Sequence, residues 1–299
     1  MTGMKGVIAA AATPIDTAGG IDLDHLAAHC AWLLGAGGCD GVNLLGTTGE
    51  ATSFSVDQRI AAMRAVAAFG LPLGQLMVGT GAAALDDAIR LTAEAKALGF
   101  AGALLLPPFY YKGVSEDGIF AYVQNVIEAA GPDSLRLYLY HFPQNSGVPF
   151  TLDTVARLRN RYPEVLVGLK DSSGDLGYSA ALAKHLPGFR VFPSAEGSIA
   201  TAADSGFAGC ISATANVTGR FASAAYRNPA DTTALEKAVR LRTLICAYPL
   251  VASVKAALAM ISGREAWNRL VPPLLPLSEE QRLALTVALA EAGLETTTP

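Results

Sequence analysis

The stretch VLVGLKDSSGD, residues 165–175, joins a short apolar run to a lysine and a polar loop. The five residues from Val165 to Leu169 have the length and composition of a strand that is buried on both faces. Lysine is seldom fully buried, because taking an ammonium group out of water is costly. The stretch therefore predicts a buried strand that ends by presenting Lys170 to a loop.

Seven other short apolar runs recur along the chain, and longer amphipathic segments separate them. Two of these segments, 55–69 and 84–98, carry apolar residues at three- and four-residue steps, which is typical of helices. Ser55 and Ser115 are the expected N-caps, because an acidic residue follows each within two positions. The predicted strands are Val7–Ala12, Val42–Leu45, Gln75–Gly79, Ala103–Leu106, Arg136–Tyr140, Val165–Lys170, Arg190–Phe192 and Gly209–Ser212.

This alternation of strands and helices predicts an α/β protein with parallel strands, since a parallel connection needs a crossover of about a dozen residues. An open doubly wound sheet would also alternate, but eight units in roughly 215 residues favour closure into a (β/α)8 TIM barrel. We expect the barrel over residues 1–230. An appended helical layer is expected over 231–299, where SEEQ at 278–281 has the pattern of a capping box.

The composition excludes several classes of protein. Hydrophobic residues make up 51% of the 299 and charged residues only 16%, so the chain can build a large core and is not disordered. The net charge of −4, without a basic stripe, argues against a nucleic-acid partner. The apolar stretches are too short or too interrupted for a membrane span or a signal peptide. The four cysteines lack CxxC spacing, so we expect reduced core residues in a cytoplasmic protein.

The ends of the strands are the first place to look for chemistry, because TIM-barrel active sites lie there. Strand alternation would put Lys170 on the same face as Leu166 and Gly168, and the glycine would leave space beside it. A neutral amine in an apolar barrel mouth is the nucleophile that forms a Schiff base with a ketone. The alternative is that Lys170 leaves the strand and pairs with Asp171 or Asp175 at the surface.

Three other strand ends carry polar groups. GTTGEA at 46–51 offers the hydroxyls of Thr47 and Thr48 beside backbone amides, which suits a small carboxylate, although a plain glycine-rich turn would look the same. Tyr140 ends the fifth strand, where a phenol relays protons or simply packs as a barrel aromatic. Tyr110 and Tyr111 follow the fourth strand in a loop that can reach another subunit or serve as interface filler.

Two further patterns compete with these candidates. Lys255, in ASVKAAL, is the rival nucleophile, but it lies in a helix pattern from which lysine ordinarily snorkels to the surface. His25 and His29 have i, i+4 spacing without an evident third ligand, so we expect no metal site. His141 follows Tyr140 directly and should point away from it.

Taken together, the strand ends resemble the dihydrodipicolinate synthase/N-acetylneuraminate lyase family of class I aldolases and lyases. GTTGEA with Gln58 downstream is similar to the family's first signature, and YHFP at 140–143 with GLKDS at 168–172 is similar to its second. The resemblance runs from Thr13-Pro14 through GCISATANV at 209–217 to PPLLPLSEE at 272–280. It covers nearly the whole chain.

The resemblance implies roles in catalysis or substrate binding for four residues at the strand ends. Lys170 would form the Schiff base with a small-molecule 2-keto acid, and Tyr140 would relay protons. Thr47 and Thr48 would bind the substrate carboxylate, and Thr48 is also assigned to the proton relay. The family uses no metal and no organic cofactor, so we expect neither.

The resemblance also implies an oligomer. Tyr111, with Tyr110 as the alternative, matches a tyrosine that crosses a dimer interface and completes the relay. The family is typically a homotetramer, built as a dimer of dimers. Ile211 matches a position whose backbone carbonyl faces the substrate.

One departure from the family pattern bears on the substrate. Lysine-biosynthetic synthases carry an arginine five residues after the tyrosine, where this chain has Asn145, and an amide makes no charged clamp on a carboxylate. In PSAEGS at 193–198, Glu196 resembles the acidic residue with which sialic-acid lyases bind substrate hydroxyls, although it would equally suit an exposed loop; Ser194 is a further candidate substrate contact. An asparagine at position 145, with KDSSGD after the strand, resembles 4-hydroxy-2-oxoglutarate aldolases and 2-keto-3-deoxy sugar-acid aldolases or dehydratases. This resemblance predicts an aldolase or lyase that cleaves or dehydrates one of those substrates. The alternatives are 4-hydroxy-tetrahydrodipicolinate synthase and a non-catalytic 2-keto-acid-binding barrel.

Overall fold

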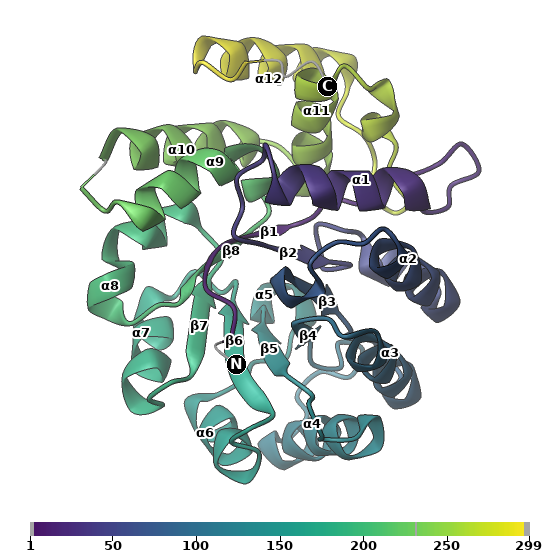
Figure 1. Ribbon diagram of the computed structural model, residues 1–299, viewed down its shortest axis with the longest axis vertical. Helices are drawn as coiled ribbons and strands as arrows, with labels where there is room; N and C mark the ends of the chain where they lie inside the picture. The colour runs from purple at the N-terminus through teal and green to yellow at the C-terminus, as the bar shows by residue number, and fades with distance from the viewer. Residues whose placement is uncertain (1–2, 231, 296–299) are drawn as a thin grey trace.

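The computed structural model describes residues 3–230 and 232–295, and within them eight parallel strands form one sheet ringed by helices (Figure 1). The strands neighbour one another in chain order from β1 to β7, and β8 lies beside β1. The sheet closes where Ala208 N, just before β8, donates to Val191 O of β7 at 2.9 Å. The predicted TIM barrel is confirmed. The strands are β1 Gly6–Ala10, β2 Gly41–Leu44, β3 Leu76–Gly79, β4 Gly102–Leu105, β5 Leu137–His141, β6 Leu166–Asp171, β7 Arg190–Pro193 and β8 Gly209–Ser212.

All eight strands were predicted to within two residues at either end, because each is a short apolar run between turn residues. The predicted helix starts are also confirmed: Ser55 and Ser278 form capping boxes, and Ser115 accepts a hydrogen bond from Gly118 N. The α-helices are α1 Leu23–Leu34, α2 Val56–Ala68, α3 Leu85–Leu98, α4 Glu116–Ala130, α5 Pro143–Ser146, α6 Leu152–Arg161, α7 Leu176–His185, α8 Ala202–Ser205, α9 Ala215–Arg227, α10 Thr232–Ile245, α11 Leu250–Ser262 and α12 Glu279–Glu291. The short 3-10 helices are η1 Ala51–Ser53, η2 Leu73–Gln75, η3 Glu196–Thr201 and η4 Glu265–Asn268.

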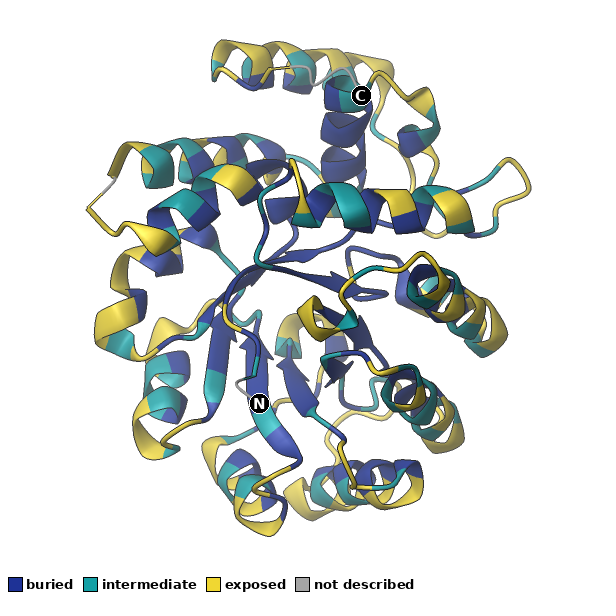
Figure 2. Ribbon diagram, viewed as in Figure 1, coloured by how far each residue is buried: buried dark blue, intermediate teal, exposed yellow. Residues whose placement is uncertain are grey.

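The strands are buried on both faces, while the helices expose their outer sides (Figure 2). In β1, Ile8 packs inside the barrel, whereas Val7 and Ala9 pack against the surrounding helices. This two-sided burial explains why the strands lack polar alternation.

The predicted alternation of β6 is right for Gly168 and Lys170 but wrong for Leu166, which packs in the outer layer. The pairing of β5 with β6 shifts register between Leu137 and Tyr138, so Val167 is an extra residue that resets the alternation. A Cβ on Gly168 would lie 2.7 Å from the Tyr138 ring. The absence of a side chain at Gly168 therefore accommodates the Tyr138 ring. It does not leave the open space beside Lys170 that the sequence predicted.

The C-terminal helices add a layer outside the ring of barrel helices, with α11 next to α1 and α12 packed on α11 (Figure 1). The predicted boundary at residue 231 lies outside the described residues.

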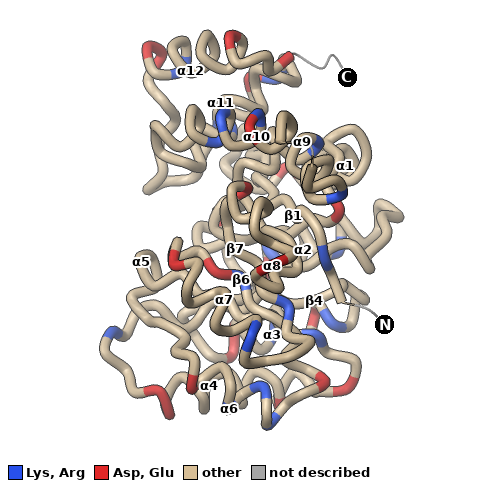
Figure 3. The backbone as a smooth tube through the Cα atoms, turned by 90° about the vertical axis from the view of Figure 1, so that its left-hand side faces the viewer, with Lys and Arg blue, Asp and Glu red and all other residues tan. Residues whose placement is uncertain are grey.

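Among the described residues, no single helix is long and apolar enough to cross a membrane; α10 and α11 pass that test only as a pair bent by 115°. Acidic and basic residues are interspersed over the helices in Figure 3. Of the four free cysteines, three are buried as predicted, but Cys246 is exposed.

Candidate active site

Lys170 and Tyr140 meet at the C-terminal end of the barrel. They are register partners on β6 and β5, and Lys170 Nζ lies 4.4 Å from the centroid of the Tyr140 ring. Lys170 is only 4% exposed, and no carboxylate among the described residues forms an ion pair with it. Pairing with Asp171 at the surface is therefore wrong: Asp171 is buried and accepts hydrogen bonds from Ser173 N and Ser179 Oγ.

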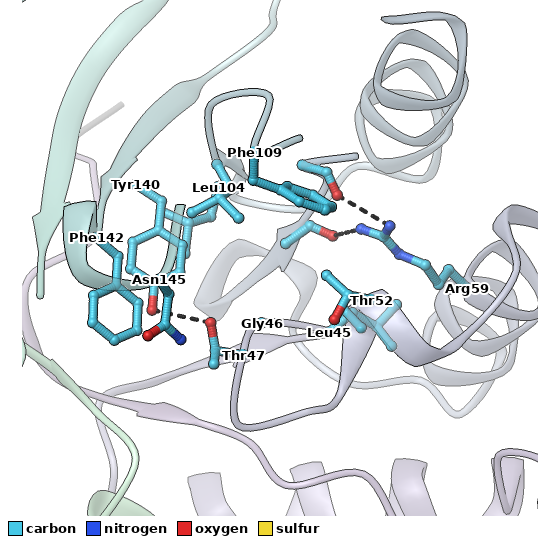
Figure 4. A pocket seen from close by; sticks show the side chains of 14 residues that line it. Leu45, Gly46, Thr47, Thr52, Arg59, Leu104, Phe109, Tyr140, Phe142 and Asn145 are labelled. Atoms are coloured by element: carbon cyan, nitrogen blue, oxygen red, sulfur yellow. Dashed lines mark hydrogen bonds between the residues drawn. The ribbon is translucent and has the colours of Figure 1, made fainter. Parts of the chain in front are cut away.

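The GTTGEA loop after β2 lies beside this pair. Two non-glycine residues in the left-handed region, Leu45 with φ 51° and Glu50 with φ 55°, bracket the loop, a conformation common at functional sites. Thr47 Oγ1 lies 3.2 Å from the Tyr140 hydroxyl, and Figure 4 shows this contact. The prediction gave the relay position to Thr48, but the threonine hydroxyl in contact with Tyr140 is that of Thr47, and Thr48 is buried beside it.

A buried ion pair anchors the same loop to the C-terminal helices. Lys255 Nζ, from α11, donates to Glu50 and also to Arg269 O at 2.8 Å, and both side chains are fully buried. Val271 N donates to the second Glu50 oxygen at 2.8 Å. Burial lowers the pKa of Lys255 and the Glu50 charge opposes that shift. Snorkelling of Lys255 is therefore wrong, and its role here is to hold the loop.

A cavity of about 830 Å³ opens above Lys170 between the barrel mouth and the C-terminal helices. A smaller cavity of about 200 Å³ adjoins it and shares Thr47, Tyr140 and Asn145 with it (Figure 4). The predicted site residues that line the larger cavity are Thr47, Thr48, Tyr140, Asn145, Lys170, Ser194 and Ile211.

Three predicted candidates lie elsewhere. Glu196 is fully buried, so the exposed-loop alternative is wrong; its Oε1 accepts from the hydroxyls of Thr214 and Thr218, and it does not line the cavity. Tyr110 and Tyr111 are 76% and 72% exposed, and their rings meet edge-on at 5.3 Å. Neither lines the cavities within the single chain.

Several residues that line the two cavities escaped prediction. Arg242 of α10 and Ser172 line the large cavity. Arg59 of α2 lines the small one, where its terminal nitrogens donate to Gly79 O at 2.8 Å and Gly81 O at 3.1 Å. Burial lowers the pKa of Arg59 to about 10. Ser172 lies in the quoted KDSSGD loop, but neither arginine has a local signal, because helical arginines are ordinarily solvated.

The histidines take no part in the cavity. The ring of His141 faces away from Tyr140 as predicted: its Nδ1 accepts from Phe150 N at 3.1 Å, and it stacks on Tyr178. His29 Nε2 bonds Asn216 at 2.9 Å, and burial lowers the pKa of His29 to about 4. In the described part of the chain, no three His, Cys, Asp or Glu side chains gather closely enough to bind a metal ion.

The barrel mouth thus combines a buried lysine, a tyrosine and a threonine-containing loop. Comparison with known proteins shows that nearly the whole chain, and not only this site, matches a family model. The model of the dihydrodipicolinate synthetase family matches residues 3–292. This chain belongs to that family. The predicted activity class, a class I aldolase or lyase, is thereby confirmed.

Individual members of the dihydrodipicolinate synthetase family match over almost their full length. A protein of Chloroflexus aurantiacus described as an uncharacterized DapA-like lyase is 37% identical over 290 residues, which is 95% of each chain. A 4-hydroxy-tetrahydrodipicolinate synthase of Azoarcus sp. is 31% identical and covers 98% of this chain and 99% of its own. The crystal structure of dihydrodipicolinate synthase from Agrobacterium tumefaciens superposes with a TM-score of 0.89 at 30% identity, covering 97% and 99% of the two chains.

Proposed function

We propose that this chain forms a Schiff base between Lys170 and the keto group of a 2-keto acid, and then cleaves or dehydrates that substrate. The observation that carries the proposal is the buried Lys170 amine, free of any described carboxylate partner and 4.4 Å from the ring of Tyr140. A buried, unpaired amine that faces a cavity is a competent nucleophile toward a ketone.

The other residues of the cavity take roles that follow from their positions. Backbone amides and hydroxyls at Thr47 and Thr48 bind the substrate carboxylate. Tyr140 passes a proton to the carbinolamine oxygen, which leaves as water, and then accepts the proton of the substrate's 4-hydroxyl as the carbon–carbon bond breaks. The Thr47 hydroxyl, 3.2 Å from Tyr140, continues this relay. The backbone carbonyl of Ile211 and the hydroxyl of Ser194 face the carbon chain of the bound substrate.

Asn145 separates this proposal from its main alternative. The amide lies at the junction of the two cavities, beside Tyr140 and Thr47 (Figure 4). At this position it carries no charge to hold the carboxylate of aspartate semialdehyde, which argues against the synthase reaction and favours a 2-keto-3-deoxy sugar acid or 4-hydroxy-2-oxoglutarate. The second of these is itself a dicarboxylate, so its far carboxylate needs a partner other than Asn145. The alternative, 4-hydroxy-tetrahydrodipicolinate synthase, is supported by the relative of that name in Azoarcus sp..

Condensation of pyruvate with aspartate semialdehyde is expected to be at least about tenfold weaker in kcat/KM than turnover of the better of the two proposed substrates. The reason is that a hydrogen bond to a charged group contributes about 1.5–3 kcal/mol, which the neutral Asn145 does not supply. Side-by-side kinetics with the purified protein measure this ratio, and Asn145→Arg should shift it toward condensation. If aspartate semialdehyde is preferred tenfold or more by the wild-type chain, the synthase alternative holds instead.

We further propose that the protein is a dimer of dimers in which Tyr111, or Tyr110, enters the site of a partner subunit. The exposure of both rings supports this, since large aromatic side chains are ordinarily covered. Sedimentation velocity on the purified protein tests the assembly, and a monomer at micromolar concentration would contradict it. A cytoplasmic location stays a prediction.

A further inference from the structure

The large cavity contains a second cationic side chain that the proposed chemistry does not use. The charged residues that line it in the described part of the chain are Glu50, Lys170 and Arg242. Glu50 is neutralised by the buried Lys255, and Lys170 is the proposed nucleophile. Arg242 is the cation that remains, and it is ion-paired with Glu196 through Nη1 alone.

Arg242 is held at one edge of its guanidinium group. Its Nη1 donates to Glu196 Oε2 at 3.1 Å, Ser212 Oγ at 3.1 Å and Thr214 Oγ1 at 3.0 Å. Arginine has five N–H donors in a planar fork, and the Nη2 and Nε groups have no partner among the described residues. The side chain is 24% exposed and faces the cavity. A fixed, half-satisfied fork of this kind suits a bidentate carboxylate.

The buried Glu196 keeps this fork in place. Its Oε1 accepts hydrogen bonds from the hydroxyls of Thr214 and Thr218 at 2.6 Å each, which fix the carboxylate. Its Oε2 accepts a hydrogen bond from Arg242 Nη1. Ser212 and Thr214 closely follow Ile211 in the chain, which ties the guanidinium to the end of β8. Glu196 is therefore a positioning residue for Arg242.

No other described cation competes for this position. Arg59 lines the smaller cavity, and both of its terminal nitrogens are already bonded to the carbonyls of Gly79 and Gly81. Asn145, where an arginine would clamp a carboxylate in the synthases, is neutral. The positive charge available to a second, distal carboxylate of the substrate is therefore that of Arg242, which lies on α10.

We propose that Arg242 binds a second carboxylate of the substrate, so that the substrate is a 2-keto dicarboxylate rather than a neutral-ended sugar acid. The inference rests on the proposed Schiff-base function and narrows it. Of the two predicted substrates it selects the class of 4-hydroxy-2-oxoglutarate, whose far carboxylate has no other described charged partner in the cavity.

Stable analogues test the proposal without turnover. The wild-type chain is titrated with 2-oxoglutarate and with 2-oxopentanoate, which has the same length but no distal carboxylate, and the adduct is fixed with borohydride at constant ionic strength and weighed by mass spectrometry. The six-carbon pair 2-oxoadipate and 2-oxohexanoate covers a longer span. We expect half-saturation at about tenfold or more lower concentration for the dicarboxylate in at least one pair.

Three variants locate the effect. Arg242→Gln should abolish the preference, and Arg242→Lys, which keeps a charge for Glu196 but loses the free fork, should lose most of it. Arg240→Gln, an exposed arginine on the same helix outside the cavity lining, removes the same charge and should keep the wild-type preference. The readout is the ratio of the two half-saturation concentrations, monocarboxylate over dicarboxylate, measured within each protein. A general loss of binding or activity in a variant therefore cancels.

The outcomes separate the inference from the function on which it rests. If the wild-type chain traps no pyruvate, the Schiff-base proposal itself fails. If it traps pyruvate but binds both members of each pair alike, or if the preference survives in both Arg242 variants, Arg242 does not bind substrate and the inference is overturned.

Discussion

Lys170→Ala is expected to gain no mass when it is incubated with pyruvate and borohydride, whereas the wild-type chain gains one pyruvate-derived group. The nucleophile must be an amine that substrate can reach in the cavity, and Lys170 is the lysine that lines it among the described residues. Borohydride reduces the imine to a stable secondary amine, so intact-mass measurement and peptide mapping locate the adduct. Catalytic turnover should fall to background in the same variant.

The control for this experiment is Lys184→Ala, which removes an exposed lysine from α7 and should label like the wild type. Lys255 is not a suitable control, because its loss would leave the carboxylate of Glu50 buried and unpaired, a change that commonly costs about 3–5 kcal/mol of stability. Persistent labelling of Lys170→Ala would overturn the assignment of Lys170 as the nucleophile. An adduct mapped to Lys255 would identify Lys255 as the nucleophile instead.

Tyr140→Phe is expected to lower turnover by about 10²–10⁴-fold, the usual contribution of a positioned acid–base group. The variant keeps the ring that packs under Lys170 Nζ and on Phe142, and loses only the hydroxyl that contacts Thr47. Folding should therefore survive, and borohydride trapping should be slowed while the final yield of adduct is retained. Steady-state kinetics and the time course of trapping measure the two effects.

Tyr138→Phe, on the same strand, is the matched control. Its phenol lies inside the barrel, accepts from Met4 N at 3.3 Å and does not line either cavity that contains Tyr140. Activity of this variant should stay close to wild type. If Tyr140→Phe also stays within a few-fold of wild type, Tyr140 serves for packing alone and the proton relay must run through another group.

The parts of the fold that follow from local pattern were predictable. The eight strands, the caps at Ser55 and Ser115 and the capping box at Ser278 each depend on residues within a few positions of one another. The barrel followed because alternating strands and helices leave few connections that bury both faces of a parallel sheet. The ends of the predicted strands also marked Lys170 and Tyr140 as candidate site residues.

Only the tertiary structure decided which polar side chains pair with which. Lys255 and Glu50 are 205 residues apart, and nothing near either one indicates the ion pair that fixes the substrate loop. Glu196 and Arg242 likewise meet across 46 residues. Local periodicity specifies the face on which a residue lies, but a buried charge needs a partner from another element. The extra residue in β6 and the choice of Thr47 over Thr48 also depend on how neighbouring strands and loops pack, and therefore could not be read from spacing alone.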